Sequence, residues 1–163
     1  MSELKTYEPH KSSIGGLDAN VAALLACLIA VIMNFIGGAQ WFMWIVPLIF
    51  FLMEKDSMLV KSHAIQAFTL GVVGAIIYII LDIIWSAIFV GSGASLFAFG
   101  LSGSGAAWFG LMAVSVIKWV VEIIIAIFLI LAMVNAYKYK EYKISWISGL
   151  TEKFAAKLNK NKS

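Results

Sequence analysis

Three ionisable residues lie in otherwise apolar stretches, where a charged side chain is costly to keep. Asp82 belongs to the apolar stretch 63–90, while Lys118 and Glu122 belong to the stretch 108–137. Intramembrane charges of this kind either satisfy one another or line a path for an ion, a proton or a translocating segment. The sequence therefore predicts an intramembrane charge cluster, and both interpretations, a fixed helix register and a polar track, remain open.

Spacing and depth predict which of these side chains meet. Lys118 and Glu122 are four residues apart and share one helix face. Asp82 lies about 12 Å from the end of its stretch at Val90, and Lys118 lies roughly 15 Å from Trp108. In antiparallel neighbours the two side chains would have similar heights. We therefore expect the Lys118 ammonium to serve Asp82 and Glu122 together.

A second candidate is the short charged turn "EKDSMLVKSHAIQAF", residues 54–68, which contains His63. A metal site would need further ligands, but the only other histidine is His10, in the polar N-terminal segment. Cys27 is the single cysteine, so no CxxC motif exists, and no serine or cysteine motif supplies a nucleophile. We expect no catalytic residue, metal or cofactor, and a structural role for His63 in hydrogen bonding to nearby carboxylates or backbone.

The composition is that of an integral membrane protein. The 163 residues are 62% hydrophobic and 13% charged, and the mean hydropathy is +0.94. This leaves too little polar surface to cover a soluble globule. All twelve basic residues are lysines that flank apolar segments. That placement indicates membrane orientation and no nucleic-acid partner.

Four apolar segments predict an all-α fold, an integral membrane four-helix bundle. The expected spans are 19–36, 41–53, 63–90 and 108–137. Asp18 is the expected N-cap of the first helix, and its segment is longer than the core of a cleaved signal peptide. The second segment is short, with Trp41 and Trp44 as interfacial anchors and a possible kink at Pro47. Residues 19–53 could be two spans or a re-entrant hairpin.

Lysine positions predict the topology. Residues 1–17 form a polar, flexible N-terminal lead, 18–145 the membrane domain and 146–163 a C-terminal tail. The lead, the 54–62 turn and the tail contain lysines, whereas the connections at 37–40 and 91–107 contain none. Because lysine-rich flanks stay in the cytoplasm, both termini are expected there, in a multi-pass protein of the cell membrane.

Small residues predict close helix packing. Ala67, Gly71 and Ala75 recur every four residues, a pattern that lets helices approach each other. The same face continues to Asp82, which should therefore point into the bundle. Such a stripe also suits association between chains, so we expect a homo- or hetero-oligomer.

The C-terminal tail has a helical apolar stripe with lysines beside it. The apolar positions are Ile147, Leu150, Phe154 and Leu158, and the lysines are Lys153, Lys157 and Lys160. This pattern predicts a short basic amphipathic helix that binds anionic lipid of the inner leaflet of the bilayer. The alternative is a frayed, solvated tail.

Two stretches resemble a known family. "VPLIFFLMEKDS" followed by V-x-x-H-x-x-x-A-F, and the closing "NAYKYKEYKISWI", are similar to the Tic-twenty-like family of small membrane proteins. The matching positions are Pro47, Lys55, Asp56, Val60, His63, Ala67 and Phe68. The resemblance covers about residues 17–147. It implies four helical spans with both ends inside, and its plant members belong to a chloroplast protein-import translocon.

Two functions follow as expectations. The first is a non-enzymatic membrane protein, a translocon-like or scaffold component that acts through partner or self-association. The alternative is an oligomeric transporter or channel subunit for small solutes or ions that uses Asp82, Lys118 and Glu122. No HExxH or GxSxG motif points to an enzyme.

Overall fold

The structure, a computed structural model, describes residues 6–91, 105–144 and 148–160. These residues form helices and connecting segments without a named strand, which confirms the predicted all-α class. The elements in chain order are α1 (Ala19–Asn34), the short 3-10 helix η1 (Ala39–Phe42), α2 (Ile45–Met53), α3 (Met58–Gly91), α5 (Gly105–Tyr137) and α6 (Ser148–Lys160).

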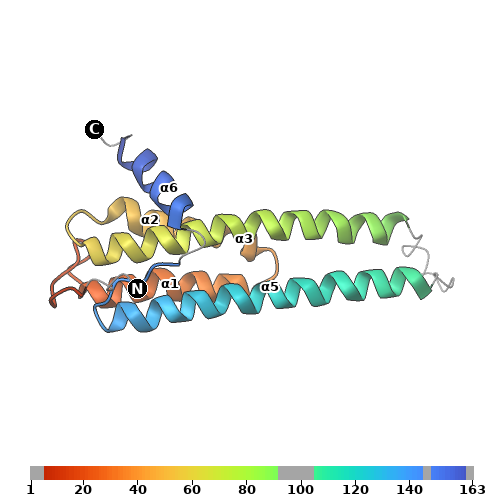
Figure 1. Ribbon diagram of the computed structural model, residues 1–163, viewed down its shortest axis with the longest axis horizontal. Coiled ribbons are helices and arrows are strands. Elements are labelled where there is room, and N and C mark those ends of the chain that lie inside the picture. The colour runs from red at the N-terminus through yellow and green to blue at the C-terminus, as the bar shows by residue number, and fades with distance from the viewer. Residues whose placement is uncertain (1–5, 92–104, 145–147, 161–163) are drawn as a thin grey trace.

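The two long helices, α3 and α5, run side by side along the molecule (Figure 1). At 34 and 33 residues they are each about 50 Å long. Both are long and apolar enough to cross a membrane, which indicates a membrane protein. Each is also longer than the roughly 30 Å hydrocarbon core of a bilayer, so part of each lies beyond it or is strongly tilted.

The remaining helices pack against only one half of the α3–α5 pair. α1 has 16 residues, about 24 Å, and packs against both α3 and α5, while η1 and α2 return along α3 (Figure 1). The buried residues of α3 accordingly end at Tyr78. The fold is thus a four-helix part at the end with the termini, continued by a two-helix extension made of α3 after Asp82 and α5 up to Ile117.

A run of alanines lets α1 sit close to its neighbours. Its buried face consists of Ala19, Ala22, Ala23, Ala26, Cys27, Ala30 and Asn34. Small side chains at this three- and four-residue spacing permit a short distance between helix axes. This stripe is as regular as the one in α3 but was not among the predicted packing residues.

The small residues of α3 are in contact with other helices. Ala67 and Ala75 are buried, and a Cβ atom added at Gly71 would lie 2.9 Å from Cα of Trp44. A Cβ at Gly74 would lie 2.8 Å from a methyl carbon of Ile125. The backbone of α3 therefore approaches the backbone at Trp44 so closely that a side chain at Gly71 would clash, whereas at Gly74 it meets the movable ends of side chains.

Boundaries of all four expected segments differ from the sequence expectation. α3 begins at Met58 and not at 63, so the turn before it is shorter than expected, and α5 begins at Gly105 and not at 108. The first helix ends at Asn34, and a turn through Gly38 (φ 81°) leads into η1. α2 begins at Ile45, so Pro47 lies in its first turn, where a missing N–H is tolerated. Pro47 thus lies at the beginning of a helix and does not interrupt one, because the chain is already interrupted between η1 and α2.

The N-terminal lead is held in place, and its expected flexibility is wrong for residues 6–18. The N–H of Tyr7 donates to the carbonyl of Tyr139 at 2.8 Å, and Lys11 pairs with Asp18 at 2.9 Å. Asp18 occupies the N-cap position of α1 but makes no side-chain cap hydrogen bond. Its carboxylate pairs with Lys11 instead, which explains the missing cap.

α5 ends in a motif that reverses the chain. The N–H of Tyr139 donates to the carbonyl of Ala136, and that of Lys140 to the carbonyl of Asn135. Tyr139 has φ 54°, the left-handed conformation that such a helix end requires and that glycine usually provides. Its hydroxyl donates to Asn20 at 3.0 Å. The tail consequently turns back along α3.

Candidate functional site

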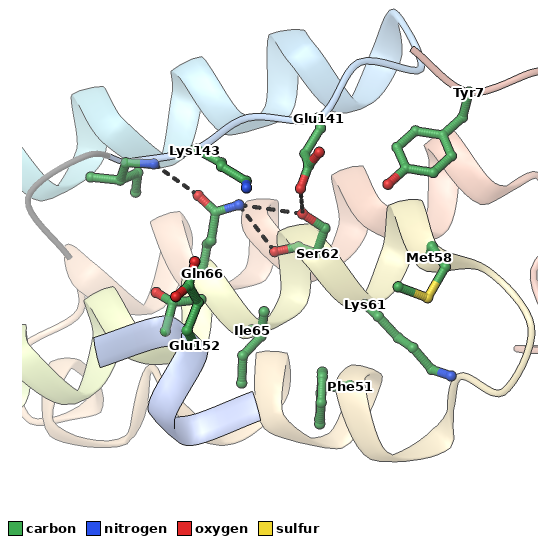
Figure 2. A pocket seen from close by; sticks show the side chains of 12 residues that line it. Tyr7, Phe51, Met58, Lys61, Ser62, Ile65, Gln66, Glu141, Lys143 and Glu152 are labelled. Atoms are coloured by element: carbon green, nitrogen blue, oxygen red, sulfur yellow. Dashed lines mark hydrogen bonds between the residues drawn. The ribbon is translucent and has the colours of Figure 1, made fainter. Parts of the chain in front are cut away.

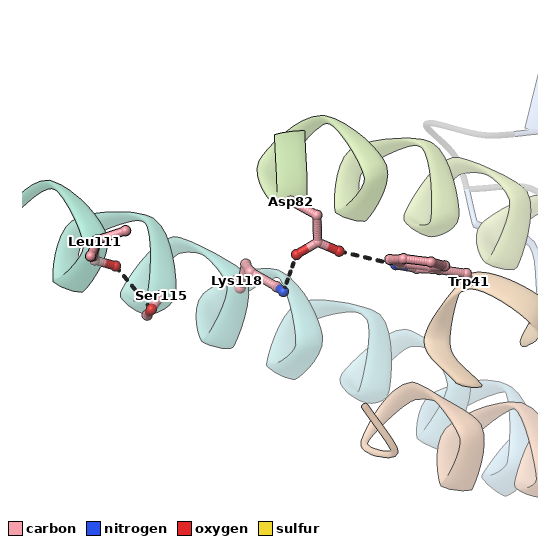
Figure 3. Close-up of polar contacts among 5 residues, drawn as sticks. All are labelled: Trp41, Asp82, Leu111, Ser115 and Lys118. Carbon is pink, nitrogen blue, oxygen red and sulfur yellow. Dashed lines mark hydrogen bonds and ion pairs between the residues drawn. The ribbon is translucent and has the colours of Figure 1, made fainter. Parts of the chain in front are cut away.

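Asp82 and Lys118 form an ion pair between the two long helices. The Lys118 ammonium lies 2.5 Å from one carboxylate oxygen of Asp82, and the indole N–H of Trp41 donates to the other at 3.0 Å. Figure 3 shows both side chains of the pair directed at each other, with Trp41 reaching in from η1. The side chains of Asp82 and Lys118 are 27% and 23% exposed. Each charge therefore has a partner inside the apolar bundle.

Glu122 is not part of this pair, contrary to expectation. Among the described residues, Lys118 forms its only ion pair with Asp82. Side chains on a helix lean toward its N-terminus, so the Lys118 side chain extends away from Glu122, and a lysine that precedes a glutamate by four residues is the poorer order for pairing. Ser115, on the same face, donates to the carbonyl of Leu111 (Figure 3).

A polar layer lies about one helical turn from the ion pair, where α1 ends. The buried side chain of Asn34 donates to the backbone carbonyl of Glu122 at 3.0 Å and accepts from the hydroxyl of Tyr78 at 2.8 Å. Beyond this layer, residues 83–117 contain no charged residue. The ion pair thus marks the border between the four-helix part and the uncharged extension.

At the opposite end, Glu54 organises the turn between α2 and α3. Its fully buried carboxylate accepts from the backbone N–H of Asp56 and Ser57 at 3.0 Å each. Both Ser12 and Ser13 of the lead also donate to it. Burial alone would raise the pKa of Glu54, but these hydrogen bonds outweigh it and lower the pKa to about 2. Glu54 therefore fastens the N-terminal lead to the start of α3.

The residues carried over from the family resemblance divide into two groups. Lys55 and Asp56 are exposed at the turn, whereas His63 is fully buried and its Nδ1–H donates to the carbonyl of Leu59 at 3.0 Å. Phe68 packs edge-on against Trp44 and Phe154, with ring centroids 6.1 and 5.3 Å apart. His63 and Phe68 thus occupy buried positions in the helix packing.

A pocket of about 370 Å³ lies next to this turn (Figure 2). Its wall is formed by α3, the returning tail and α6. The polar lining includes Lys61, Ser62, Gln66, Glu141, Lys143 and Glu152. The apolar lining includes Phe51, Met58, Ile65 and Ile144. A cavity lined by both apolar and charged side chains suits an amphipathic small molecule.

Gln66 positions the tail that forms one side of the pocket. Its side-chain amide donates to the carbonyl of Tyr142, and its oxygen accepts from the N–H of Ile144 at 3.0 Å. The Ser62 hydroxyl lies 3.4 Å from Glu141 (Figure 2). The Gln66 side chain thus satisfies one backbone carbonyl and one backbone N–H of the tail, as a neighbouring strand would.

The expected C-terminal helix is present as α6, with Lys153 and Lys157 exposed. Its Phe154 packs on Phe68 of α3, so part of its apolar stripe contacts protein. Leu150 is 44% exposed. Ile147, the side chain of Leu158 and the connection 92–104 lie outside the described residues.

Sequence reasoning missed the residues that organise the polar end. Glu54 and Gln66 contact segments 41 and 76 residues away, and no local pattern encodes such partners. One signal was available for Gln66: an amide in an otherwise apolar helix needs a partner when buried. The same reasoning would have singled out Asn34.

Metal-ligating side chains and the single cysteine are further candidates for a functional site. Within residues 6–91, 105–144 and 148–160, no group of three His, Cys, Asp or Glu side chains could hold a metal ion. Cys27 is fully buried. Two features of the described residues that could serve a function are the Asp82–Lys118 ion pair and the pocket beside α6.

Comparison with known proteins yields no relative. No protein-family model, no curated protein and no solved structure matches the chain.

Proposed function

We propose that this chain is a non-enzymatic, multi-pass protein of the cell membrane that acts through association, as a translocon-like or scaffold component. The observation that carries the proposal is the two-helix extension beyond the Asp82–Lys118 pair. Large apolar side chains of this extension are exposed, among them Ile83, Val90 and Phe109, and neither α1 nor α2 runs beside it in Figure 1.

The spacing of polar residues along α3 and α5 supports a position for the bilayer. Sixteen residues of α3 separate Gln66 from Asp82, about 24 Å, and nineteen residues of α5 separate Lys118 from Tyr137, about 28 Å. These distances match the roughly 30 Å hydrocarbon core. The four-helix part is therefore the membrane-embedded unit, with α1 and η1–α2 as two short spans and the lysine-rich ends in the cytoplasm.

This placement puts the extension at and beyond the outer surface of the membrane. α3 continues for nine residues after Asp82, about 14 Å. Val90, Phe109 and Met112 in this region are 71%, 80% and 65% exposed. Apolar surface of this extent outside the hydrocarbon core marks an interaction site, so a protein partner or a second copy covers it.

The charge pair favours a structural role over transport. The carboxylate of Asp82 is held by both Lys118 and Trp41, and an ion path would need such a group to be released. The family resemblance of the 54–68 turn agrees with a translocon-like role. The resemblance also implies that both termini lie in the cytoplasm.

Site-specific photo-cross-linking in intact cells tests the proposal. A photoreactive residue at Phe109 should give one discrete adduct, either with a protein partner or with a second copy. The matched control is Ile76, which is 54% exposed but lies within the membrane-embedded part, and it should give lipid adducts only. Absence of a protein adduct at Phe109, together with ion flux in liposomes that Asp82→Asn abolishes, would favour the transporter alternative.

A further inference from the structure

We infer that the pocket beside α6 binds the headgroup of a zwitterionic phospholipid, with phosphoethanolamine as the best match. This inference rests on the proposed membrane placement, because it takes the pocket to lie at the cytoplasmic surface of the bilayer. The evidence is the charge pattern of the lining, its apolar floor and its position relative to α6.

The charged lining is balanced in sign. Lys61 and Lys143 supply two ammonium groups, and Glu141 and Glu152 supply two carboxylates, around one cavity of about 370 Å³. An anionic headgroup would meet both carboxylates as well as the lysines. A zwitterion that contains a phosphate and an ammonium group can satisfy both signs at once.

The lining keeps hydrogen-bonding capacity for such a ligand. Lys61 donates to the carbonyl of Lys55 at 2.6 Å, which uses one of the three N–H donors of its ammonium. Ser62 lies near one oxygen of Glu141 at 3.4 Å, so the second carboxylate oxygen can accept from a primary ammonium. A quaternary ammonium has no N–H to donate, which favours ethanolamine over choline.

The apolar lining continues from the polar groups toward the membrane-embedded part. Phe51 comes from α2, and Met58 and Ile65 come from α3 (Figure 2). Deeper along the same helix, Phe68 packs against Phe154 of α6. A headgroup at Lys143 would therefore have its glycerol and first acyl carbons over apolar side chains, as an interfacial lipid requires.

Lipid retention by the full-length protein tests the inference. The protein is purified in detergent and mixed with phosphatidylethanolamine, phosphatidylcholine or phosphatidylglycerol of identical acyl chains, and bound lipid is counted by native mass spectrometry. We expect phosphatidylethanolamine to be retained at about tenfold lower concentration than either of the others, a difference of about 1.4 kcal/mol. Equal retention of the three lipids overturns the inference.

Two variants separate the two halves of the headgroup. Lys143→Gln should weaken retention of all three lipids, because all contain the phosphate. Glu152→Gln should remove the preference for phosphatidylethanolamine over phosphatidylglycerol. Lys157→Gln and Glu8→Gln, which change the same charges on exposed residues outside the pocket, should behave as the unmodified protein. Wild-type retention in Lys143→Gln together with wild-type selectivity in Glu152→Gln contradicts the inference.

A soluble competitor distinguishes a lipid from a free metabolite. Glycerophosphoethanolamine should displace the retained lipid only at concentrations at least about tenfold higher, because it lacks the apolar contacts. Displacement at equal concentration would overturn the assignment to a lipid. The cross-link at Phe109 does not involve the pocket, so loss of lipid selectivity with that cross-link intact leaves the proposed function standing.

Discussion

The Lys118 ammonium lies 2.5 Å from the Asp82 carboxylate at the level where α1 ends. This contact joins α3 to α5 just before the two helices lose the cover of α1 and α2. Trp41 adds a third element, η1, to the same point. The pair therefore fixes the register of the long helices at the border of the four-helix part.

Removing either charge should destabilise the protein. Asp82→Asn or Lys118→Gln leaves a partly buried charge without its counterpart, and we expect a loss of about 1–3 kcal/mol of unfolding free energy. The double variant should lose less than the sum of the two single variants. Thermal unfolding in detergent measures this, with Ser115→Ala as the control. Two silent single variants would show that the pair does not contribute to folding or assembly.

Gly71 should not tolerate a side chain. The added Cβ of Gly71→Ala would lie 2.9 Å from the Trp44 backbone, and overpacking of this kind costs about 1–3 kcal/mol. Gly91→Ala is the matched control, because nothing lies within 4 Å of that position, and it should be neutral or slightly stabilising. Equal unfolding temperatures for the two variants would contradict the close approach of α2 and α3.

Glu54 should make the stability of the polar end depend on acidity. Its pKa is lowered to about 2 in the folded state, against an ordinary value of about 4.3. The stabilisation is therefore fully present above about pH 5 and is lost as the pH falls toward 2. In Glu54→Gln this pH dependence should disappear, while Asp56→Asn, at an exposed position, should keep it. Unfolding curves measured between pH 2 and 7 decide between these outcomes.

Gln66 should control the order of the tail. Gln66→Leu keeps the volume but removes the hydrogen bonds to Tyr142 and Ile144. Hydrogen exchange at residues 140–154 should accelerate at least about tenfold, since one or two hydrogen bonds of about 1 kcal/mol are lost. Thr69→Val removes a hydrogen bond within α3 alone and should leave tail exchange unchanged. Unaltered exchange in Gln66→Leu would mean that α6 holds the tail by itself.

The sequence was sufficient for features that follow from the position of a residue along a helix. The length of the apolar segments predicted the long helices, and the spacing of small residues predicted their close packing. The depth of each residue along an antiparallel pair predicted that Asp82 and Lys118 lie at one height. Glu54 and Gln66 were not predictable in this way, because their partners come from segments far away in the chain. Glu122 shows a further limit: residue spacing placed it on the correct face, but the direction of the Lys118 side chain decided the pairing.

The position of the bilayer relative to the ion pair is the central claim, and a depth measurement tests it most directly. Spin labels at Ile76, Ile83 and Phe109, each as a single cysteine in a Cys27→Ala background, are compared for oxygen and nickel-complex accessibility in nanodiscs holding one chain. These three side chains are 54%, 63% and 80% exposed. We predict hydrocarbon depth at position 76, the membrane border at 83 and an aqueous environment at 109. Maximum depth at 83, with 109 still in the hydrocarbon, would contradict the account by placing Asp82 and Lys118 at the centre of the membrane.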